Sequence, residues 1–348
     1  MMNNMRLDTC FSCMLLSLML TACSYIHDEL EPCPSGLYLA FRYDYNLQQA
    51  NMFSDHVGAV AVYLFDEEGH FLQKQTEQGT ALQDPNYRMR FELPPARYQY
   101  VVWAAQKPLS TPNADGRASF VLQEPQVGDP FSVMSCTLSR DEAGEVIHGG
   151  LPLDTIWHGM SQQLLEVLPS QFVVDTASLV RDTKHISISL RDLDDPSRLH
   201  VDHYQFVLSD RQSYLAWNNQ PVEDSPLIYT PYATWNTEDL QHTSVVDGKI
   251  AHADFMTSRL ITHASAAEDA ILSVTNRHSE VEVIRVNLPD LLCQLRTSTE
   301  LQLFSPQEFL DRGYDYRLTF FLRGDHWEYV QVEISVLSWI VRNQSIIL

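Results

Sequence analysis

Hydrophobic and polar residues alternate over many short segments of this chain. The alternation is clearest in residues 37–45, where leucine, phenylalanine and tyrosine occupy every second position, and it recurs in 314–322 and 330–336. An apolar residue at every second position is typical of a β-strand that buries one face. Segment 57–65 is instead almost continuously apolar, which predicts a strand buried on both faces. The pattern therefore predicts a protein built from short β-strands.

The same pattern continues along the rest of the chain. Asp66 to Gly69 predicts a tight turn with glycine at a positive φ angle, so that the flanking strands form a hairpin. Between Val283 and Ile284 the apolar side chains change face, which predicts a β-bulge. Loops are predicted at 107–130 and 210–240, and further strands at 70–73, 89–93, 98–104, 131–138, 159–168, 185–193, 201–208 and 281–288.

Signals for helices are few. Ser305, Pro306 and Glu308 form a typical helix start, which predicts a helix of about two turns that ends near Gly313. Another short helix is predicted at 291–295, after a proline. Strands do not alternate with helices, so a parallel sheet is not expected. Short strands separated by turns predict an all-β fold made of β-sandwiches.

The length of the chain bears on the number of domains. It has 348 residues, of which 45% are hydrophobic, and a prior of about 150 residues per domain favours two domains. We place the boundary near 162–170, just after the segment Trp157-His158-Gly159. The predicted domains are an N-terminal β-sandwich at 37–162 and a C-terminal β-sandwich at 163–348.

The N-terminus carries the most specific motif of the sequence. A short apolar run from Met14 ends in Leu20-Thr21-Ala22-Cys23, which is a lipobox. In such a motif the cysteine thiol receives diacylglycerol, and the preceding peptide is removed. The run is shorter than the roughly 18 apolar residues of a membrane-spanning helix. We therefore predict a lipoprotein signal peptide at 1–22 and a lipid-anchored protein attached through Cys23.

Residues 23–36 are predicted to be the lipidated linker. Its acidic residues Asp28, Glu29 and Glu31 lie just after the lipid site. Two interpretations stay open: the cluster directs export to the cell surface, or it is a solvated spacer. Cys33 lies between two prolines, which favours a rigid, extended tether because proline restricts the residue before it.

Charge and cysteine content exclude several functions. The formal net charge is −22, and such a surface repels nucleic acid. Three cysteines remain after the lipid site, at Cys33, Cys136 and Cys293, without the spacing of metal ligands. The sequence does not decide whether any two of them form a disulfide.

The chain lacks the sequence motifs of common catalytic sites. We find no nucleophile elbow, zinc-protease motif, phosphate-binding loop or calcium loop. In a strand, His200 and Asp202 would share a face while His203 points away, so they do not form a metal site. We predict no enzyme activity, no cofactor and no metal. The tryptophans are interpreted as core or interface residues rather than sugar platforms: Trp157, Trp235, Trp327 and Trp339.

Several segments together resemble one known family. The most specific are PCPSGL at 32–37 and FRYDYN at 41–46, which follow the lipobox and the acidic linker. Weaker matches cover the rest of the chain, at 62–66, 97–104, 157–159, 231–232, 307–312 and 339–342. These segments resemble the FimB/Mfa-type fimbrial anchor lipoproteins of Bacteroidetes, which belong to the type V pilus system.

The resemblance implies a fold and a function. The fold would be two tandem transthyretin-like Greek-key β-sandwich domains with few short helices. The function would be that of a non-enzymatic structural subunit, anchored by lipid in the outer membrane and exposed at the cell surface, that ends a fimbrium at its base. Its partners would be shaft pilins and accessory subunits. Two alternatives stay open, a tip adhesin of the same system and a surface glycan-binding lipoprotein.

The family resemblance also implies that shaft subunits polymerise by exchanging strands. A polymerising subunit needs a basic protease site shortly after its first strand, yet Arg42 lies within the predicted first strand and the next basic residue is Lys74. We therefore expect the first strand to be retained. The alternating residues of the late strand are a candidate donor strand for a neighbouring pilin, with completion of the second sandwich as the other possibility: Val330, Val332, Ile334 and Val336.

Overall fold

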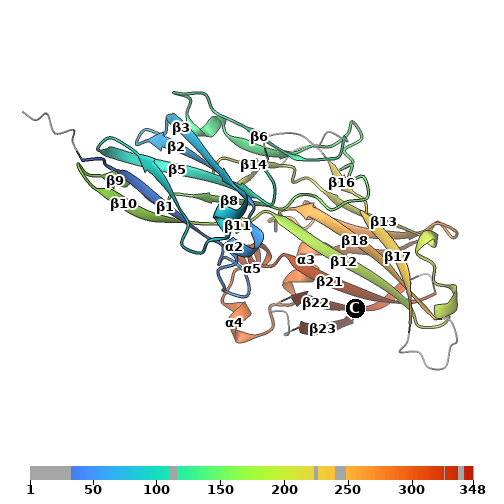
Figure 1. The fold of residues 1–348 in the computed structure, drawn as a ribbon. Coiled ribbons are helices and arrows are strands. Elements are labelled where there is room, and N and C mark those ends of the chain that lie inside the picture. The colour runs from blue at the N-terminus through green and yellow to red at the C-terminus, as the bar shows by residue number, and fades with distance from the viewer. Residues whose placement is uncertain are drawn as a thin grey trace, which may run out of the picture.

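The computed structural model describes residues 33–109, 116–222, 226–239, 248–324, 326–335 and 341–347. In these residues the protein consists of strands in five sheets with a few short helices. The first half of the chain and the second half lie next to each other along the length of the molecule (Figure 1). The expectation of an all-β fold of packed sheets is confirmed.

The first sandwich packs a three-stranded sheet against a six-stranded sheet. The smaller sheet has the order β10-β1-β4, with β1 in the centre. Its strands are β1 (Gly36–Arg42), β4 (Arg88–Glu92) and β10 (Phe172–Ser178). The larger sheet has the order β11-β8-β5-β2-β3, with β9 also paired to β5. Its strands are β2 (Ala59–Asp66), β3 (Phe71–Gln78), β5 (Ala96–Ala105), β8 (Ile156–Met160), β9 (Leu165–Val167) and β11 (Val180–Arg181).

Strand β2 is buried on both faces, as its continuous apolar sequence predicts. Val62 and Leu64 pack in the core beneath β1. Tyr63 and Phe65 point to the other side and join the core that extends toward the second half of the chain. All four side chains are fully buried. The six-stranded sheet is therefore the middle layer of the first half.

The second sandwich also pairs a large sheet with a smaller one. The large sheet has the order β17-β18-β12-β21-β22-β23, and the smaller one β16-β13-β19-β20. The strands of the large sheet are β12 (Thr183–Asp192), β17 (Ala233–Glu238), β18 (Lys249–Ser258), β21 (Asp315–Arg323), β22 (His326–Ser335) and β23 (Val341–Ile347). Those of the smaller sheet are β13 (Tyr204–Asp210), β16 (Leu227–Tyr229), β19 (Ile271–Asn276) and β20 (Glu282–Asn287).

A fifth sheet joins the two halves of the chain. Its order is β15-β14-β7-β6, and it contains β6 (Phe120–Gln123), β7 (Ser135–Leu138), β14 (Tyr214–Ala216) and β15 (Pro221–Val222). The prediction that 107–130 and 210–240 are loops is therefore wrong at β6 and at β14 to β17. These strands have two to six residues, too few for alternation to stand out, and distant partners stabilise them.

Strand pairing places the domain boundary later than the sequence suggested. The predicted division between 37–162 and 163–348 separates β8 from β9, β10 and β11, which pair with β5, β1 and β8 of the first sandwich. We therefore propose that the first domain continues to about Asp182. One hydrophobic core contains both Trp103 of the first sandwich and Ile186 of the second, so the two sandwiches share part of their core.

The local turn and helix predictions agree with the structure. Gly69 has a φ of 86° in the β2–β3 turn. The pairing of β19 with β20 shifts at Val283, which confirms the bulge. The Oγ of Ser305 accepts a hydrogen bond from the Glu308 N–H at 3.1 Å and begins helix α5. The helices are α2 (Phe53–His56), α3 (Leu288–Cys293), α4 (Thr299–Gln302) and α5 (Pro306–Arg312), and the 3₁₀ turns are at 79–83, 131–133, 196–198 and 201–203. Within the described residues, no helix has the length and hydropathy needed to cross a bilayer.

The central position of β22 leads to a stability prediction. Val332 is fully buried, and its strand pairs with both β21 and β23. Val332→Asp should lower the free energy of unfolding by more than about 4 kcal/mol, because it buries an unpartnered carboxyl group. Urea denaturation measures this, with His326→Asp at the exposed start of the same strand as the control. Equal stability of the two variants would contradict the burial of β22.

Candidate functional site

The first strand is held firmly at the point where the chain enters the body of the protein. The Oγ of Ser35 donates a hydrogen bond to the Leu93 carbonyl at 2.7 Å, and the Gly36 N–H donates to the Gln171 carbonyl at 3.0 Å. A Cβ atom at position 36 would lie 1.9 Å from the Phe91 carbonyl oxygen, so only glycine fits between the neighbouring strands. β1 is thus fixed on both sides from its first residue.

Strand β1 is also part of the core. Leu37, Leu39 and Phe41 are buried, and the strand pairs in parallel with β10 over its whole length and antiparallel with β4. Removal of β1 would expose these side chains and the backbone edges of both neighbours. The groove that β1 occupies is therefore filled by the chain's own residues.

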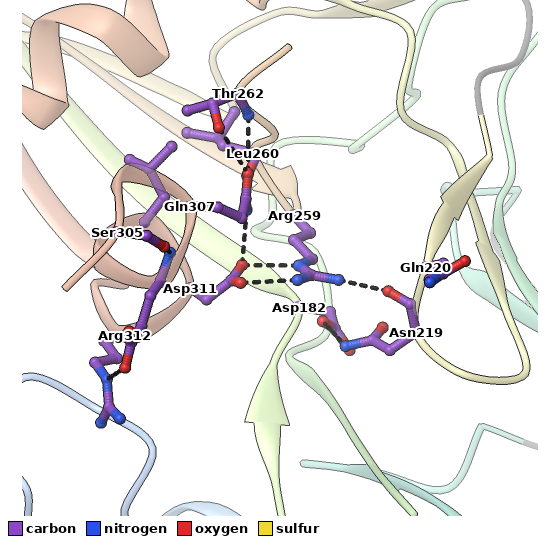
Figure 2. Close-up of polar contacts among 12 residues, drawn as sticks. Asp182, Asn219, Gln220, Arg259, Leu260, Thr262, Ser305, Gln307, Asp311 and Arg312 are labelled. Carbon is purple, nitrogen blue, oxygen red and sulfur yellow. Dashed lines mark hydrogen bonds and ion pairs between the residues drawn. The ribbon is translucent and has the colours of Figure 1, made fainter. Parts of the chain in front are cut away.

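The two sandwiches meet at a buried group of charged side chains, which we call the junction. The junction consists of Asp182, Lys184, Asn219, Arg259 and Asp311, all with little or no exposure. Asp182 lies between β11 and β12, and Lys184 is the second residue of β12. Asp311 lies on helix α5 near the C-terminus, and Arg259 directly follows β18. Figure 2 shows how the side chains of Asp182, Asn219, Arg259 and Asp311 converge.

Arg259 and Asp311 form the central ion pair of the junction. Nε and Nη2 of Arg259 each donate to one carboxylate oxygen of Asp311 at 2.7 Å. The third nitrogen of the guanidinium donates to the carbonyl oxygen of Asn219 (Figure 2). Gln307, one turn earlier on α5, donates to Asp311 at 3.0 Å and to the Leu260 carbonyl at 3.0 Å. This two-point geometry fixes α5 against the end of β18.

Asp182 is partly unsatisfied in this setting. Its Oδ1 accepts a hydrogen bond from Asn219 Nδ2 at 2.9 Å, while Oδ2 has no partner among the described residues. Burial raises the pKa of Asp182 to about 7, partly offset by the charge of Arg259. A protonated carboxyl group fits the site better than a carboxylate, because the buried charge lacks a direct cationic partner.

Lys184 connects the start of β12 to the end of α5 through hydrogen bonds. Its Nζ donates to the Gly313 carbonyl at 2.8 Å, to the Asp311 carbonyl at 3.0 Å and to the Arg181 carbonyl at 3.5 Å. Burial lowers the pKa of Lys184 to about 7, and the nearby carboxylates oppose the shift. The amine thus holds the C-terminal end of α5 against the start of β12.

Two arginines extend the junction through contacts with aromatic rings. The guanidinium of Arg181 lies 4.4 Å from the ring centre of Tyr314. That of Arg312, on α5, lies 4.0 Å from the ring of Tyr45, which belongs to the first sandwich. A cation that lies over an aromatic ring is attracted to the electron-rich face of that ring. Helix α5 therefore contacts both sandwiches and acts as a connector between them.

Some of the other candidate residues from the sequence lie outside the described ranges, and others are buried in the second sandwich. Cys23, Asp28, Glu29, Glu31, Val336 and Trp339 lie outside the described residues. Val330, Val332 and Ile334 are buried in β22 between β21 and β23, so the strand completes the second sandwich in this conformation. Its donation to a neighbour stays a prediction, as does the role of the acidic cluster.

The tryptophan, histidine and cysteine candidates can also be placed. Trp157 is fully buried, whereas Trp235 is 38% exposed and stacks on His252, so it is not a core residue. The Nε2 atom of His200 lies 3.2 Å from Lys249 Nζ. In the described ranges, no three His, Cys, Asp or Glu side chains come together as metal ligands. Cys33, Cys136 and Cys293 are free thiols.

The residues of the junction were not predicted from the sequence. The available signal is a run of charged residues, RDTK at 181–184, directly before a strongly alternating strand. Such a run normally indicates a solvated turn. Its burial depends on α5 and on the turn at Asn219, which are far away in sequence and could not be paired with it.

The fold defines a class of proteins built from packed β-sandwiches, and comparison with known proteins agrees with this fold. A family model for fimbrillin-A associated anchor proteins Mfa1 and Mfa2 matches residues 30–345. The chain therefore belongs to this family of fimbrial anchor proteins. None of the curated proteins compared with the chain matches it.

Solved structures show the same fold. A putative adhesin from Bacteroides thetaiotaomicron has 24% identity and a TM-score of 0.74, covering 90% of this chain and 99% of its own. Putative polysaccharide binding proteins from the same species have 26% identity and a TM-score of 0.70, with coverage of 90% and 98%. The fimbrial anchor protein Mfa2 from Porphyromonas gingivalis has 16% identity and a TM-score of 0.61, with coverage of 86% and 97%.

The buried carboxyl group of Asp182 leads to a prediction about pH. Since its pKa is raised to about 7 in the folded protein, its stabilising contribution is complete below about pH 4 and is lost as the pH rises through 7. Asp182→Asn removes this loss while keeping the acceptor for Asn219. The free energy of unfolding of the variant, measured relative to that of wild type, should increase by at least about 1.4 kcal/mol from pH 4.5 to pH 8. This increase is the equivalent of one pKa unit.

Urea denaturation at both pH values measures the difference in free energy of unfolding. Asp55→Asn, at an exposed carboxylate of helix α2, is the matched control and should follow the wild type at both pH values. If Asp182→Asn follows the wild type as closely as the control does, Asp182 is ionised throughout and the description of the junction is wrong.

Proposed function

We propose that this protein is a lipid-anchored, non-enzymatic subunit that ends a fimbrium at its base on the outer membrane. The observation that carries the proposal is the position of β1. This strand follows the linker to Cys23 directly, and it forms the centre of its sheet with Leu37, Leu39 and Phe41 buried. A subunit that keeps this strand keeps its connection to the lipid.

The retained strand also explains how such a subunit would end a polymer. Strand exchange needs a groove that a neighbour's strand can enter. In this protein β1 fills that position and pairs with strands on both sides. Arg42 is the last residue of β1 and forms an ion pair with Asp44 at 3.3 Å, so it is not part of a long exposed loop. These features support a chain that does not accept a strand at this groove.

The direction of the strands suits a subunit under tension. β1 and β10 run in parallel, and β10, β11 and β12 follow one another from the first sandwich into the second (Figure 1). A pull on the lipid acts at the start of β1, whereas any load carried by the second sandwich reaches β10 through its C-terminal end. Parallel strands pulled in this way are sheared, so their hydrogen bonds share the load instead of opening one by one.

The role of Cys23 can be tested in cells that produce the fimbrium. Cys23→Ala removes the thiol that would carry the lipid, so the protein should lose labelling by a fatty-acid analogue and should be released or remain unprocessed. Fimbriae should then be shed into the medium. Membrane fractionation and quantification of shed fimbriae measure both effects, with Cys33→Ala as the control. Normal lipid labelling and membrane retention of Cys23→Ala would reject the anchor.

A second variant in the same experiment separates anchoring from surface export. Replacement of Asp28, Glu29 and Glu31 by alanine should preserve lipid labelling but protect the protein from protease added to intact cells. If the protein stays fully accessible to the protease, the acidic cluster is a spacer and not an export signal.

A further inference from the structure

The six-stranded sheet of the first sandwich has a hollow on the face turned away from β1. Ala59 and Ala61 of β2 and Ala105 of β5 form part of its wall, and Trp103 of β5 lies beside them. The hollow has a volume of about 430 Å³, which is in the range of ligand sites. It arises because three alanines occupy positions on a sheet face where larger side chains would fill the space.

The hollow lies between the edges of two sheets. Thr76 and Gln78 of β3 line one side, and Leu122 of β6 lines the other. β3 is the last strand of the six-stranded sheet, and β6 is the last strand of the sheet that joins the two halves. In the described residues, β3 has a backbone partner on its outer side only at its start, where Phe71 bonds to residues 128 and 129. Both strands can be seen along the upper side of the molecule in Figure 1.

One end of the hollow is closed by polar side chains that satisfy one another. Glu124 accepts hydrogen bonds from Lys74 Nζ at 2.6 Å and from the Tyr63 hydroxyl at 2.9 Å. The charges of Glu124 and Lys74 therefore balance, and this end does not select a charged ligand. The remaining wall is mostly apolar and includes Pro108 and Leu109.

A buried donor in the wall lacks a partner. Trp103 is fully buried and packs against the edge of His158 at 4.8 Å between ring centres. Its indole N–H has no hydrogen-bond partner among the described residues. The indole N–H is itself buried, so the tryptophan contributes the apolar surface of its ring to the wall of the hollow.

We propose that the hollow is the docking site for an extended segment of a partner fimbrial subunit, which adds to the free edge of β3 and places an apolar side chain between β3 and β6. This inference rests on the proposed function, because it assigns the surface through which the base subunit holds its neighbour. It differs from the groove of β1, which is filled. The occupant is a peptide in extended form because, among the described residues, two terminal strands, β3 and β6, flank the hollow and offer backbone groups at their outer edges.

The pairing of β2 with β3 shows which side chains face the hollow and which lie on the other face of the sheet, and the variants are chosen accordingly. Ala61 pairs with Thr76 across β2 and β3, and both side chains face the hollow. Val62 pairs with Gln75 on the opposite face of the sheet. Ala61→Phe should fill the hollow, and Thr76→Trp should block it from its exposed rim. Gln75→Phe also places an aromatic ring on β3, next to Thr76 but on the other face of the sheet, and it is the control.

The experiment uses the full-length protein in cells that assemble the fimbrium. A photo-cross-linking amino acid at Gln78, on the rim of the hollow, should form a covalent product with a fimbrial subunit, and mass spectrometry should map it to alternating residues of one extended segment. Ala61→Phe and Thr76→Trp should each reduce this product at least about tenfold, equivalent to a loss of about 1.4 kcal/mol, whereas Gln75→Phe should not. Thermal unfolding of each purified variant confirms that it is folded.

The outcomes separate this inference from the proposed function. If deletion of the whole protein releases fimbriae but both folded hollow variants retain them and the cross-link, the docking site is wrong and the base function stands. If deletion of the whole protein leaves fimbriae attached to cells, the base function is wrong. A cross-link only to residues 110–115 of the same chain would mean that the protein fills its own hollow, and it would also overturn the docking site.

Discussion

The ion pair between Arg259 and Asp311 is the interaction on which the arrangement of this protein depends. Both side chains are nearly excluded from water, and loss of one partner of a buried pair leaves an uncompensated charge that costs about 3–5 kcal/mol. The pair fixes helix α5 to the end of β18, and Lys184 fixes the same helix to β12. α5 in turn contacts Tyr45 of the first sandwich. The relative position of the two sandwiches therefore depends on these polar contacts together with the apolar core that the sandwiches share.

Buried polar contacts of this kind fix the orientation of the elements they join but contribute little net stability. Replacement of a buried ion pair by well-packed apolar side chains often stabilises a protein. The advantage of the ion pair here is that it fixes an orientation, because the planar guanidinium of Arg259 meets the carboxylate of Asp311 in one orientation only. A shared apolar core, which includes Trp103 and Ile186, supplies the bulk of the contact. The two together give a connection with one defined geometry between the first and the second sandwich.

The sequence predicted the local structure of this protein well and its long-range pairing poorly. Alternation identified β1, β21 and β22, a phase change located the bulge at Val283, and Ser305 marked the start of α5, because each signal lies within a few residues. Strands β6 and β14 to β17 were missed since they are short and depend on distant partners. The domain boundary near 162–170 stays a prediction, and nothing in the sequence of residues 163–181 shows that they pair with β1, β5 and β8.

The same distinction applies to the candidate sites. The lipobox and the retention of the first strand, which stay predictions, could be proposed from the sequence because each rests on a contiguous motif. The junction and the hollow are not, because both arise from side chains on strands and turns far apart in the chain. The alanines of the hollow are ordinary strand residues in the sequence, and only their common face opposite β6 makes them a site. Sequence therefore predicted what the family does better than how this chain does it.

The position of the protein in the native fimbrium tests the account most directly. Antibodies against the second sandwich, detected by immunogold electron microscopy on intact cells and on sheared fimbriae, report where the protein lies. The account predicts a single label per fimbrium at the cell-proximal end, and loss of that label from fimbriae that break above the base. Label at the distal tip, or repeated along the shaft, would contradict a subunit that ends the polymer at the membrane.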